Sequence, residues 1–442
     1  MVNGFAYFAV APVADAEVPA RLQAAEEAFE RKLWRDDMAR WERETKPAAI
    51  RAHLALQAID PGTLDREALL DHLARCRDHQ ERMIRQHHTF NAPAMVPVGD
   101  FIAHVSEWTD RPVGEFLALL RGAAPESAGS FPELARLTAA LQENPSARAL
   151  LESAGEPADV LQSLLSEPSA VGETARAYIE LVGYRLLDTF DPAEPFALEL
   201  PEVLVNGLRQ AVTTGAPASS EASAEEEERV RSLIPAGNRD EFAELLGEAR
   251  FTSRLRDERG LYSEVWAGGI TRRAILAGGA ELVKEGRLAD PSDLAEADYE
   301  EMRALLQGRD GPSARELAER ARFRAASHVS QAPPFLGEPP QPPPPLDGLP
   351  PLPARMMRAV GTAIDSLFRG AETESEATIV RGIGASPGVY TGTARRIDSP
   401  EEFGRLQSGD VLVTATTTES FNIVLPMLGA IVTDSGGVLS HP

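Results

Sequence analysis

The chain carries a compact group of chemistry-bearing residues in the segment TDSGGVLSHP, at positions 433–442. Gly436 and Gly437 remove side chains from a turn that follows the strand-like run GAIVT, so backbone amides there can approach a ligand closely. Ser440 is a residue type that begins helices, which predicts that His441 lies in a first helical turn that favours negative charge. A neutral imidazole in such a place suits attack on phosphorus. On this motif alone, a surface histidine in a glycine-rich turn is the preferred interpretation.

A second group of charged residues lies in the segment RLRDERGLY, which contains Arg254, Arg256, Glu258, Arg259 and Tyr262. Arginines at this density could steady a transferring phosphoryl group while Glu258 accepts the proton of an acceptor hydroxyl. Such clusters are more often solvated helix faces with ion pairs between successive turns. The substrate-side role of these residues is therefore a hypothesis that needs further support.

Histidine and tryptophan residues in the first quarter of the chain offer weaker signals. His87 and His88 are adjacent and point to different sides of a helix, unlike the paired histidines of zinc enzymes, so no metal site is predicted. Trp34, Trp41 and Trp108 could line an apolar acceptor pocket, although burial in a helical core is the commoner use of large aromatic side chains.

Composition narrows the classes of partner and the cellular location. The 442 residues carry a formal charge of -24, which repels nucleic acid phosphates and anionic membrane surfaces, so neither is an expected partner. The single cysteine, Cys76, excludes a disulfide framework and a CxxC metal site. No run of apolar residues is long enough for a membrane span, and the first residues lack the features of a signal peptide. These observations predict a cytoplasmic protein.

Periodicity divides the chain into a long helical part and a short strand-rich part. Apolar residues recur every three or four positions over residues 1–330, with an acidic segment at 213–229 that predicts a mobile loop leading into a helix. Residues 331–353 contain four consecutive prolines and predict an extended linker, and residues 354–378 predict a linker helix and an acidic segment. In that helix Met357, Val360, Ile364, Leu367 and Phe368 have the spacing of a packing face. Short runs rich in Val, Ile and Thr over 379–442 predict strands.

The strand-rich part resembles the swivelling phosphohistidine domain of the phosphoenolpyruvate-utilizing enzyme superfamily. Three ordered motifs carry the resemblance: Gly384, Ser386, Pro387, Gly388, Gly392 and Ala394; the run GDVLV at 409–413; and Thr433, Gly436, Gly437, Ser440 and His441. The resemblance implies that His441 becomes phosphorylated and that the other four residues of the last motif form its loop. The superfamily continues beyond this histidine with a helix and further strands, so the domain is expected to be truncated here.

The helical part resembles the acceptor domain that precedes the swivelling domain in rifampicin phosphotransferases and their relatives. The segments VNGFAYF, AYIELVGYRLLDTFD and RLRDERGLYSEVW carry this looser resemblance. Where those relatives have Gly-His-Arg, this sequence has Gly183, Tyr184 and Arg185, so a role for the histidine cannot be transferred. The expected fold is multidomain: a mostly α-helical N-terminal domain plus a small, incomplete α/β swivelling domain.

These features lead to a functional hypothesis with two alternatives. His441 takes a phosphoryl group from ATP and delivers it to a hydroxyl of a small organic acceptor held by the helical domain. No phosphate-binding loop is visible, so ATP and magnesium are expected on a partner or missing ATP-grasp domain, and no cofactor is expected on this chain. The first alternative is a noncatalytic binding module or pseudoenzyme with an incomplete phosphohistidine domain. The second, a fragment of a phosphoenolpyruvate synthase or dikinase, is less favoured because of the position of the helical domain.

Overall fold

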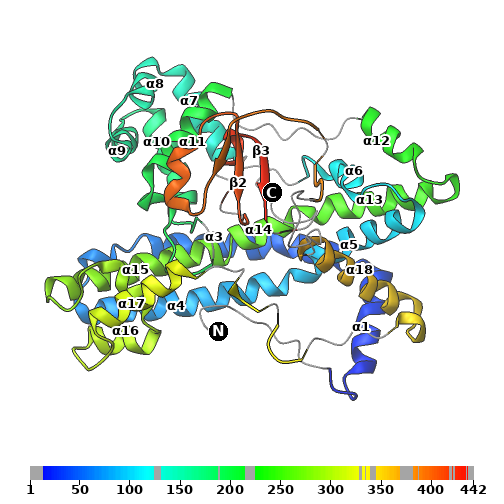
Figure 1. Ribbon diagram of the computed structural model, residues 1–442, viewed down its shortest axis with the longest axis horizontal. Coiled ribbons are helices and arrows are strands. Elements are labelled where there is room, and N and C mark those ends of the chain that lie inside the picture. Colours follow the sequence, from blue (N-terminus) through cyan, green and yellow to red (C-terminus); the bar gives the residue numbers. More distant parts are fainter. Residues whose placement is uncertain are drawn as a thin grey trace.

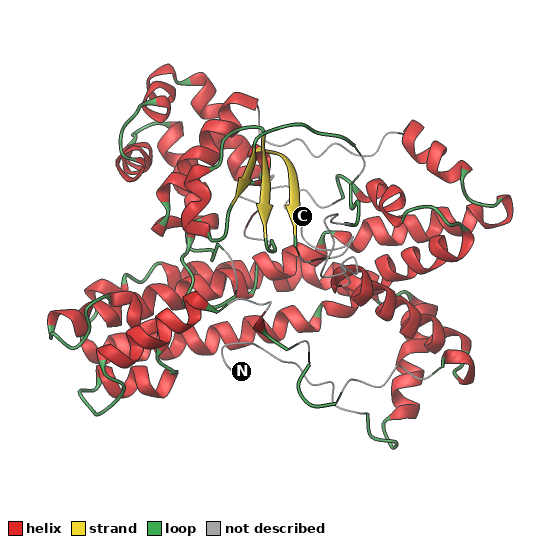
Figure 2. Ribbon diagram, in the orientation of Figure 1, coloured by secondary structure: helices red, strands yellow, loops and turns green. Residues whose placement is uncertain are grey.

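The computed structural model is mostly helical and contains one small parallel sheet (Figures 1 and 2). It describes residues 13–123, 131–187, 190–214, 224–327, 331–333, 335–338, 345–368, 382–386, 388–417, 421, 424–434 and 436. The prediction of a mostly helical chain with a small strand-containing part is confirmed. None of the described helices is long and apolar enough to cross a membrane.

The helices together form what we call the helical unit. In chain order they are α1 (Val18–Arg31), α2 (Trp34–Arg40), a π-helical turn (Trp41–Thr45), α3 (Lys46–Gln57), α4 (Arg66–Thr89), α5 (Asn91–Trp108), α6 (Val113–Leu117), α7 (Pro132–Glu143), α8 (Pro145–Glu152), α9 (Pro157–Ser166), α10 (Ala170–Val182), α11 (Pro201–Thr214), α12 (Ala224–Ser232), α13 (Arg239–Ser253), α14 (Leu255–Leu261), α15 (Glu264–Lys284), α16 (Tyr299–Leu306), α17 (Ala314–Ala326) and α18 (Pro351–Phe368).

Two long helices, α4 and α15, pack along each other and form one arm of the helical unit (Figure 1). The side chain of Asp65 caps α4 by accepting a hydrogen bond from the amide of Ala68 at 2.9 Å, which satisfies one of the free amides of the first turn. Fourteen of the 21 residues of helix α15 are buried, and its glycines allow close approach of other backbone segments. A Cβ atom at Gly269 would lie 1.8 Å from the carbonyl oxygen of Tyr184, so only glycine fits there.

The second arm consists of α5, α13 and α18, which pack against one another through α5. Its structure corrects the prediction of a linker at residues 331–353. Residues 331–353 were expected to be extended throughout, but a 3-10 turn forms at Leu346–Gly348 and α18 begins at Pro351. Proline is tolerated in the first turn of a helix because its missing amide has no partner there anyway. Helix α18 packs directly on α5, so it belongs to the helical unit and is not a free linker helix.

The packing face of α18 agrees with the predicted one only in part, since Val360 and Leu367 do pack against buried clusters. Ala359 and Ala363 are fully buried, whereas Met357 and Ile364 are about half exposed. The cause is Gly99 of α5, where an added Cβ would lie 2.1 Å from the carbonyl oxygen of Ala359. At this separation of the two backbones only small side chains fit between the helices.

Residues 213–229 were predicted as a mobile loop that leads into the first turn of a helix, and the structure gives the bounds of the two helices on either side. Helix α11 extends to Thr214 and α12 begins at Ala224, while residues 215–223 lie outside the described part of the chain. Three glutamates occupy the first turn of α12, where the helix dipole favours them. The predicted position of the glutamates in the first turn of a helix is therefore confirmed.

The strand module consists of β1 (Ala394–Arg396), β2 (Asp410–Thr414), β3 (Leu428–Thr433) and their described connections. The three strands are parallel in the order β1-β2-β3, with Val411 opposite Ala394 and Ala430. Of the described residues in the first predicted strand run, 382–386 and 388–397, only 394–396 form a strand. Phe403, Leu412 and Phe421 fill a small core, and Val203 of α11 completes it. The strand module therefore rests on the helical unit beside α11 (Figure 1).

Candidate functional site

The charged segment RLRDERGLY comprises Arg254 at the junction of α13 and α14, all of α14, and Tyr262 in the turn before α15, and it lies inside the helical unit. Glu258 is completely buried. Its Oε2 atom accepts hydrogen bonds from Trp41 Nε1 at 2.8 Å and from Lys46 Nζ at 3.0 Å. Arg254 lies 3.8 Å from Oε1 of the same carboxylate and 3.0 Å from Glu42. Glu258 is thus the centre of a buried ion-pair cluster.

Tyr262 is also buried, and cations lie against its ring. Lys46 Nζ is 4.5 Å from the ring centroid, and the guanidinium of Arg185 is 5.1 Å from it. Arg185 is nearly buried and also faces the rings of Phe131 and Trp266. Such contacts stabilise a buried cation through the negative faces of the rings. Arg254, Glu258 and Tyr262, three of the predicted residues, are therefore brought together.

A pair of neutral histidines is hydrogen-bonded to the backbone of this cluster. His53 Nε2 donates to the carbonyl oxygen of Tyr262 at 3.1 Å, and His79 Nε2 is 2.9 Å from His53 Nδ1. Burial lowers the pKa of His53 to about 3 and that of His79 to about 4. Both rings are therefore neutral near pH 7, and the hydrogen bonds require His79 to donate to His53.

Arg256, the fourth predicted residue, points to a different partner. It forms a two-pronged ion pair with the buried carboxylate of Asp257, with distances of 2.8 and 3.1 Å. Arg259 donates to the carbonyl oxygen of Arg256 and, at 3.1 Å, to the side-chain oxygen of Asn91. Arg256 and Glu258 thus lie on different faces of α14, as the 3.6-residue period of a helix requires.

Helix α15 begins with a buried acidic residue that the sequence analysis missed. Glu264 Oε1 lies 2.5 Å from His87 Nδ1 in the last turn of α4, and the adjacent Gln86 donates to the hydroxyl of Ser263 at 3.0 Å. Burial raises the pKa of Glu264 to about 8, although the nearby charges of Arg259 and His88 act to lower it. A carboxyl group that titrates near neutral pH can exchange a proton under physiological conditions.

The histidine loop follows β3 directly. Thr433 pairs with Thr414 of β2, the amide of Asp434 donates to the carbonyl oxygen of Thr414 at 3.2 Å, and Gly436 has φ 120°. Backbone with this φ strongly favours glycine. Gly437, Ser440 and His441 lie outside the described residues. In the view of Figure 1, the arrowheads of β2 and β3 point toward the part of the helical unit labelled α14.

Lys46, His87, Arg185 and Glu264 were not predicted as site residues. Two of them had a sequence signal: His87 in the His87-His88 pair, and Arg185 in the Gly183-Tyr184-Arg185 segment. Within the described ranges, no three His, Cys, Asp or Glu residues lie close enough together to hold a metal ion. The cluster around Glu258 offers several cations and aromatic rings, and Glu264, two residues after Tyr262, offers a carboxyl group that titrates near neutral pH. This chemistry suits an anionic or hydroxyl-bearing ligand.

Comparison with known proteins gives related matches over different parts of the chain. The family model "Rifampicin phosphotransferase fourth domain" matches residues 88–257. An uncharacterized phosphotransferase of Bacillus subtilis, YvkC, is 25% identical over 312 residues, which are 68% of this chain and 35% of that protein. Chondramide synthase of Chondromyces crocatus is 26% identical over 466 aligned residues, 100% of this chain and 12% of the synthase.

A third match is a probable phosphoenolpyruvate synthase of Methanothermobacter thermautotrophicus, which is 35% identical over 80 residues, 18% of this chain and 12% of that protein. The chain thus spans about a third or less of the length of these relatives.

Proposed function

We propose that this chain, which is related to the phosphoenolpyruvate-utilizing enzyme superfamily, is the carrier and acceptor-binding part of a phosphotransferase. The main support for the proposal is that the helical unit comes before the strand module in the chain and is in contact with it. A helical unit with a buried charged cluster packs, through Val203, against a parallel sheet whose last strand leads into the Gly436 turn ahead of His441. Direct transfer of a phosphoryl group from His441 requires the acceptor site to lie close to the strand module.

The proposed reaction has two steps. A nitrogen of the His441 imidazole attacks a phosphoryl group of ATP held with magnesium by an ATP-grasp partner, so an N–P bond forms, the P–O bond that held this phosphoryl group breaks, and the remaining nucleotide leaves. An oxygen of the acceptor's hydroxyl then attacks the same phosphorus, the N–P bond breaks, and the hydroxyl proton passes to a base. Positioning and charge stabilisation carry most of the catalysis in such transfers.

On the acceptor side, we propose that the cations of the cluster stabilise the phosphoryl group. Arg254 is the candidate with a partly exposed side chain, and its present partners are carboxylates. Glu258 has a positioning role in this scheme because its carboxylate is buried and occupied by Trp41 and Lys46. The His87–Glu264 pair is better suited to exchange the proton, since the Glu264 pKa of about 8 lies near working pH.

Single-turnover transfer tests the proposal. The full chain would be loaded with phosphoramidate, which phosphorylates imidazoles, and mixed with hydroxyl compounds, beginning with rifampicin because the matching family model carries its name. We expect the N–P signal in ³¹P NMR to be replaced by a phosphate ester signal with at least one acceptor. Arg254→Ala should slow this transfer about tenfold or more without changing loading.

Arg315→Ala is the matched control, because Arg315 is an exposed arginine on α17 outside the cluster. Equal transfer rates for the wild type and Arg254→Ala would refute the proposed acceptor side. Discharge to water alone with every acceptor tried would refute the function.

A further inference from the structure

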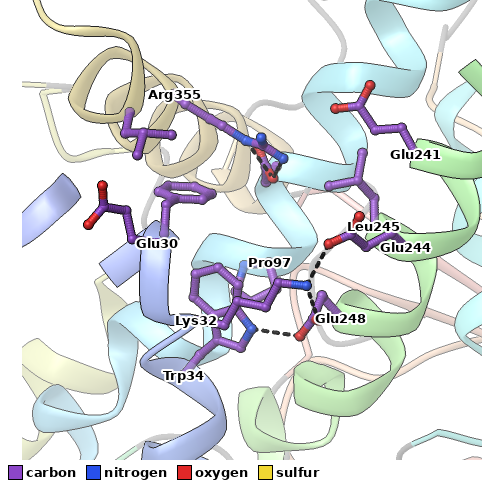
Figure 3. Close-up of a pocket in the computed structure, with 12 residues that line it drawn as sticks. Glu30, Lys32, Trp34, Pro97, Glu241, Glu244, Leu245, Glu248 and Arg355 are labelled. Carbon is purple, nitrogen blue, oxygen red and sulfur yellow. Dashed lines mark hydrogen bonds and ion pairs between the residues drawn. The ribbon is translucent and has the colours of Figure 1, made fainter. Parts of the chain in front are cut away.

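A second site of a different kind lies on the opposite arm of the helical unit (Figure 3). It is a pocket of about 190 Å³ between the end of α1, the start of α2, and helices α5, α13 and α18. The cavity is smaller than the roughly 300–1,000 Å³ of pockets for drug-sized ligands. Its occupant must therefore be small.

The pocket has aromatic and aliphatic walls. Phe29 and Trp34 meet edge to face at 5.4 Å between ring centroids, and Pro97, Leu245 and Leu352 complete the apolar surface. Trp34 is held in place because its Nε1 donates to Glu248 at 2.8 Å. The guanidinium of Arg355 already lies 5.0 Å from the ring centroid of Phe29, so this wall accepts a cation.

The charge of the pocket is negative. Its lining holds five carboxylates, Glu30, Asp100, Glu241, Glu244 and Glu248, against only two strongly basic side chains, Lys32 and Arg355. Both basic groups are engaged: Lys32 with Glu244 at 2.6 Å and Glu248 at 2.8 Å, and Arg355 with Asp100 at 2.7 Å. Among the described residues, Glu241 has one ion-pair partner within 4.0 Å, which is His104 at 3.9 Å. His104 also donates a hydrogen bond to the carbonyl oxygen of Asp100.

Glu30 and Glu241 therefore leave negative charge at the rim. Figure 3 shows Glu241, Glu244 and Glu248 projecting from one helix, with Glu30 across the pocket from them.

One side of the pocket is formed by the end of helix α1, which has the features of a movable element. Helix α1 has no buried residue, and it is joined to α2 through Lys32 at φ 51° and ψ 52°. This left-handed conformation is strained for a non-glycine residue, and it is held by the backbone hydrogen bonds of the helix cap together with the Lys32 ion pairs. Phe29 and Glu30, in the last turn of α1, can move with that helix to admit a ligand.

We infer that this pocket binds a small organic cation, an ammonium or amidinium group on an apolar body, between Trp34 and the carboxylates of Glu30 and Glu241. The aromatic wall accommodates the apolar body and the rim carboxylates neutralise the head group. The inference is independent of the histidine loop and of the phosphoryl transfer proposed above.

Binding of 2-phenylethylammonium to the full chain tests the inference, with 3-phenylpropionate as an anion of similar shape. Intrinsic fluorescence and saturation-transfer NMR would both follow binding. We expect saturable binding of the amine, at least about tenfold tighter than that of the anion, with a fluorescence change that Trp34→Phe removes. Glu30→Gln combined with Glu241→Gln should weaken amine binding about tenfold or more, since each hydrogen bond to a charged group contributes about 1.5–3 kcal/mol.

Glu300→Gln, at an exposed glutamate on α16, is the matched control and should leave the affinity unchanged. Circular dichroism establishes that each variant is folded. Absence of saturable amine binding to the folded wild type, equal binding of amine and anion, or an unchanged affinity in the double variant would each overturn the inference.

Discussion

Glu258 illustrates how burial decides what a charged residue can do. Its carboxylate is removed from water and depends on Trp41 and Lys46 for compensation. A buried carboxylate that loses its cationic partner is strongly destabilising, typically by about 3–5 kcal/mol. The stability of the fold therefore depends on Glu258 keeping its cationic partner.

Lys46→Met should lower the free energy of unfolding by about 3 kcal/mol, because the methionine keeps the side-chain volume and removes the charge. Adding Glu258→Gln should recover at least half of this loss, since the buried charge is then gone as well. Urea unfolding of the two single variants and the double variant measures the coupling. Strict additivity of the two changes would show that the ion pair has no energetic role.

Glu264 predicts a specific dependence of stability on pH. The folded chain keeps this carboxyl protonated up to about pH 8, whereas the unfolded chain releases the proton near 4.5. Between these values the folded state binds more protons, so this group makes the free energy of unfolding fall as pH rises, and its effect levels off above pH 8.

Glu264→Gln should flatten that slope between pH 5 and 8, because the amide fills the same space and does not titrate. Urea midpoints at several pH values measure the effect, and Glu281→Gln, at a glutamate paired with Lys284, serves as the control. The same slope in the wild type and Glu264→Gln would contradict the raised pKa.

At the level of single residues, the sequence predicts local clusters better than long-range ones. Arg254, Glu258 and Tyr262 are close in sequence and on successive turns, so their proximity follows from helical geometry. Lys46 reaches this cluster from α3, and His87 of α4 reaches Glu264 beside it, both from distant parts of the sequence. Only the packing of α3 and α4 on α14 and α15 brings them together, and no local pattern encodes that packing.

At the level of elements, the close approach of α5 and α18 depends on the absence of one side chain. Gly99→Ala should lower the free energy of unfolding by about 2 kcal/mol, because the new methyl group would overlap the backbone of Ala359 and push the helices apart. Thermal and urea unfolding would measure the loss.

Gly361→Ala is the matched control on the partner helix, since nothing lies within 4 Å of a Cβ at that position. It should stabilise the chain by about 0.5–1 kcal/mol through the higher helix propensity of alanine. Equal effects of the two substitutions would show that the interface is looser than described.

The same interface shows why element boundaries were harder to predict than element types. Helical periodicity identified α18, but a run of prolines suggested that the extended chain continued to residue 353. Proline fits both an extended chain and the first turn of a helix, so composition alone could not place the boundary. The buried alanines were overlooked because the predicted packing face was based on the spacing of large apolar residues. A helix face that consists of small residues does not show in that spacing.

At the level of the whole molecule, the strand module is tied to the helical unit through Val203. Val203→Ala should loosen this contact by about 1–2 kcal/mol of lost apolar burial. Cleavage by trypsin after Arg405, in the 3-10 helix whose Gly404 lies near Glu202, should become several-fold faster.

Val205→Ala, two residues along the same helix, is the control, because Val205 belongs to the core of the helical unit. It should lower the unfolding midpoint and leave the rate of cleavage after Arg405 unchanged under native conditions. Equal cleavage rates for the wild type and Val203→Ala would contradict docking of the strand module at this position.

The phosphohistidine assignment is the claim on which the proposed function depends, and site-resolved labelling tests it most directly. The full chain and His441→Ala would each be treated with phosphoramidate, and the modified histidines would be identified by mass spectrometry under alkaline conditions, with ³¹P NMR to follow the N–P signal. The chain has eight histidines, so the others report the background reactivity. We expect His441 to be labelled first and the leading N–P signal to be absent from the variant. Labelling of His441 no faster than that of the other histidines, or an unchanged signal in His441→Ala, would contradict the assignment.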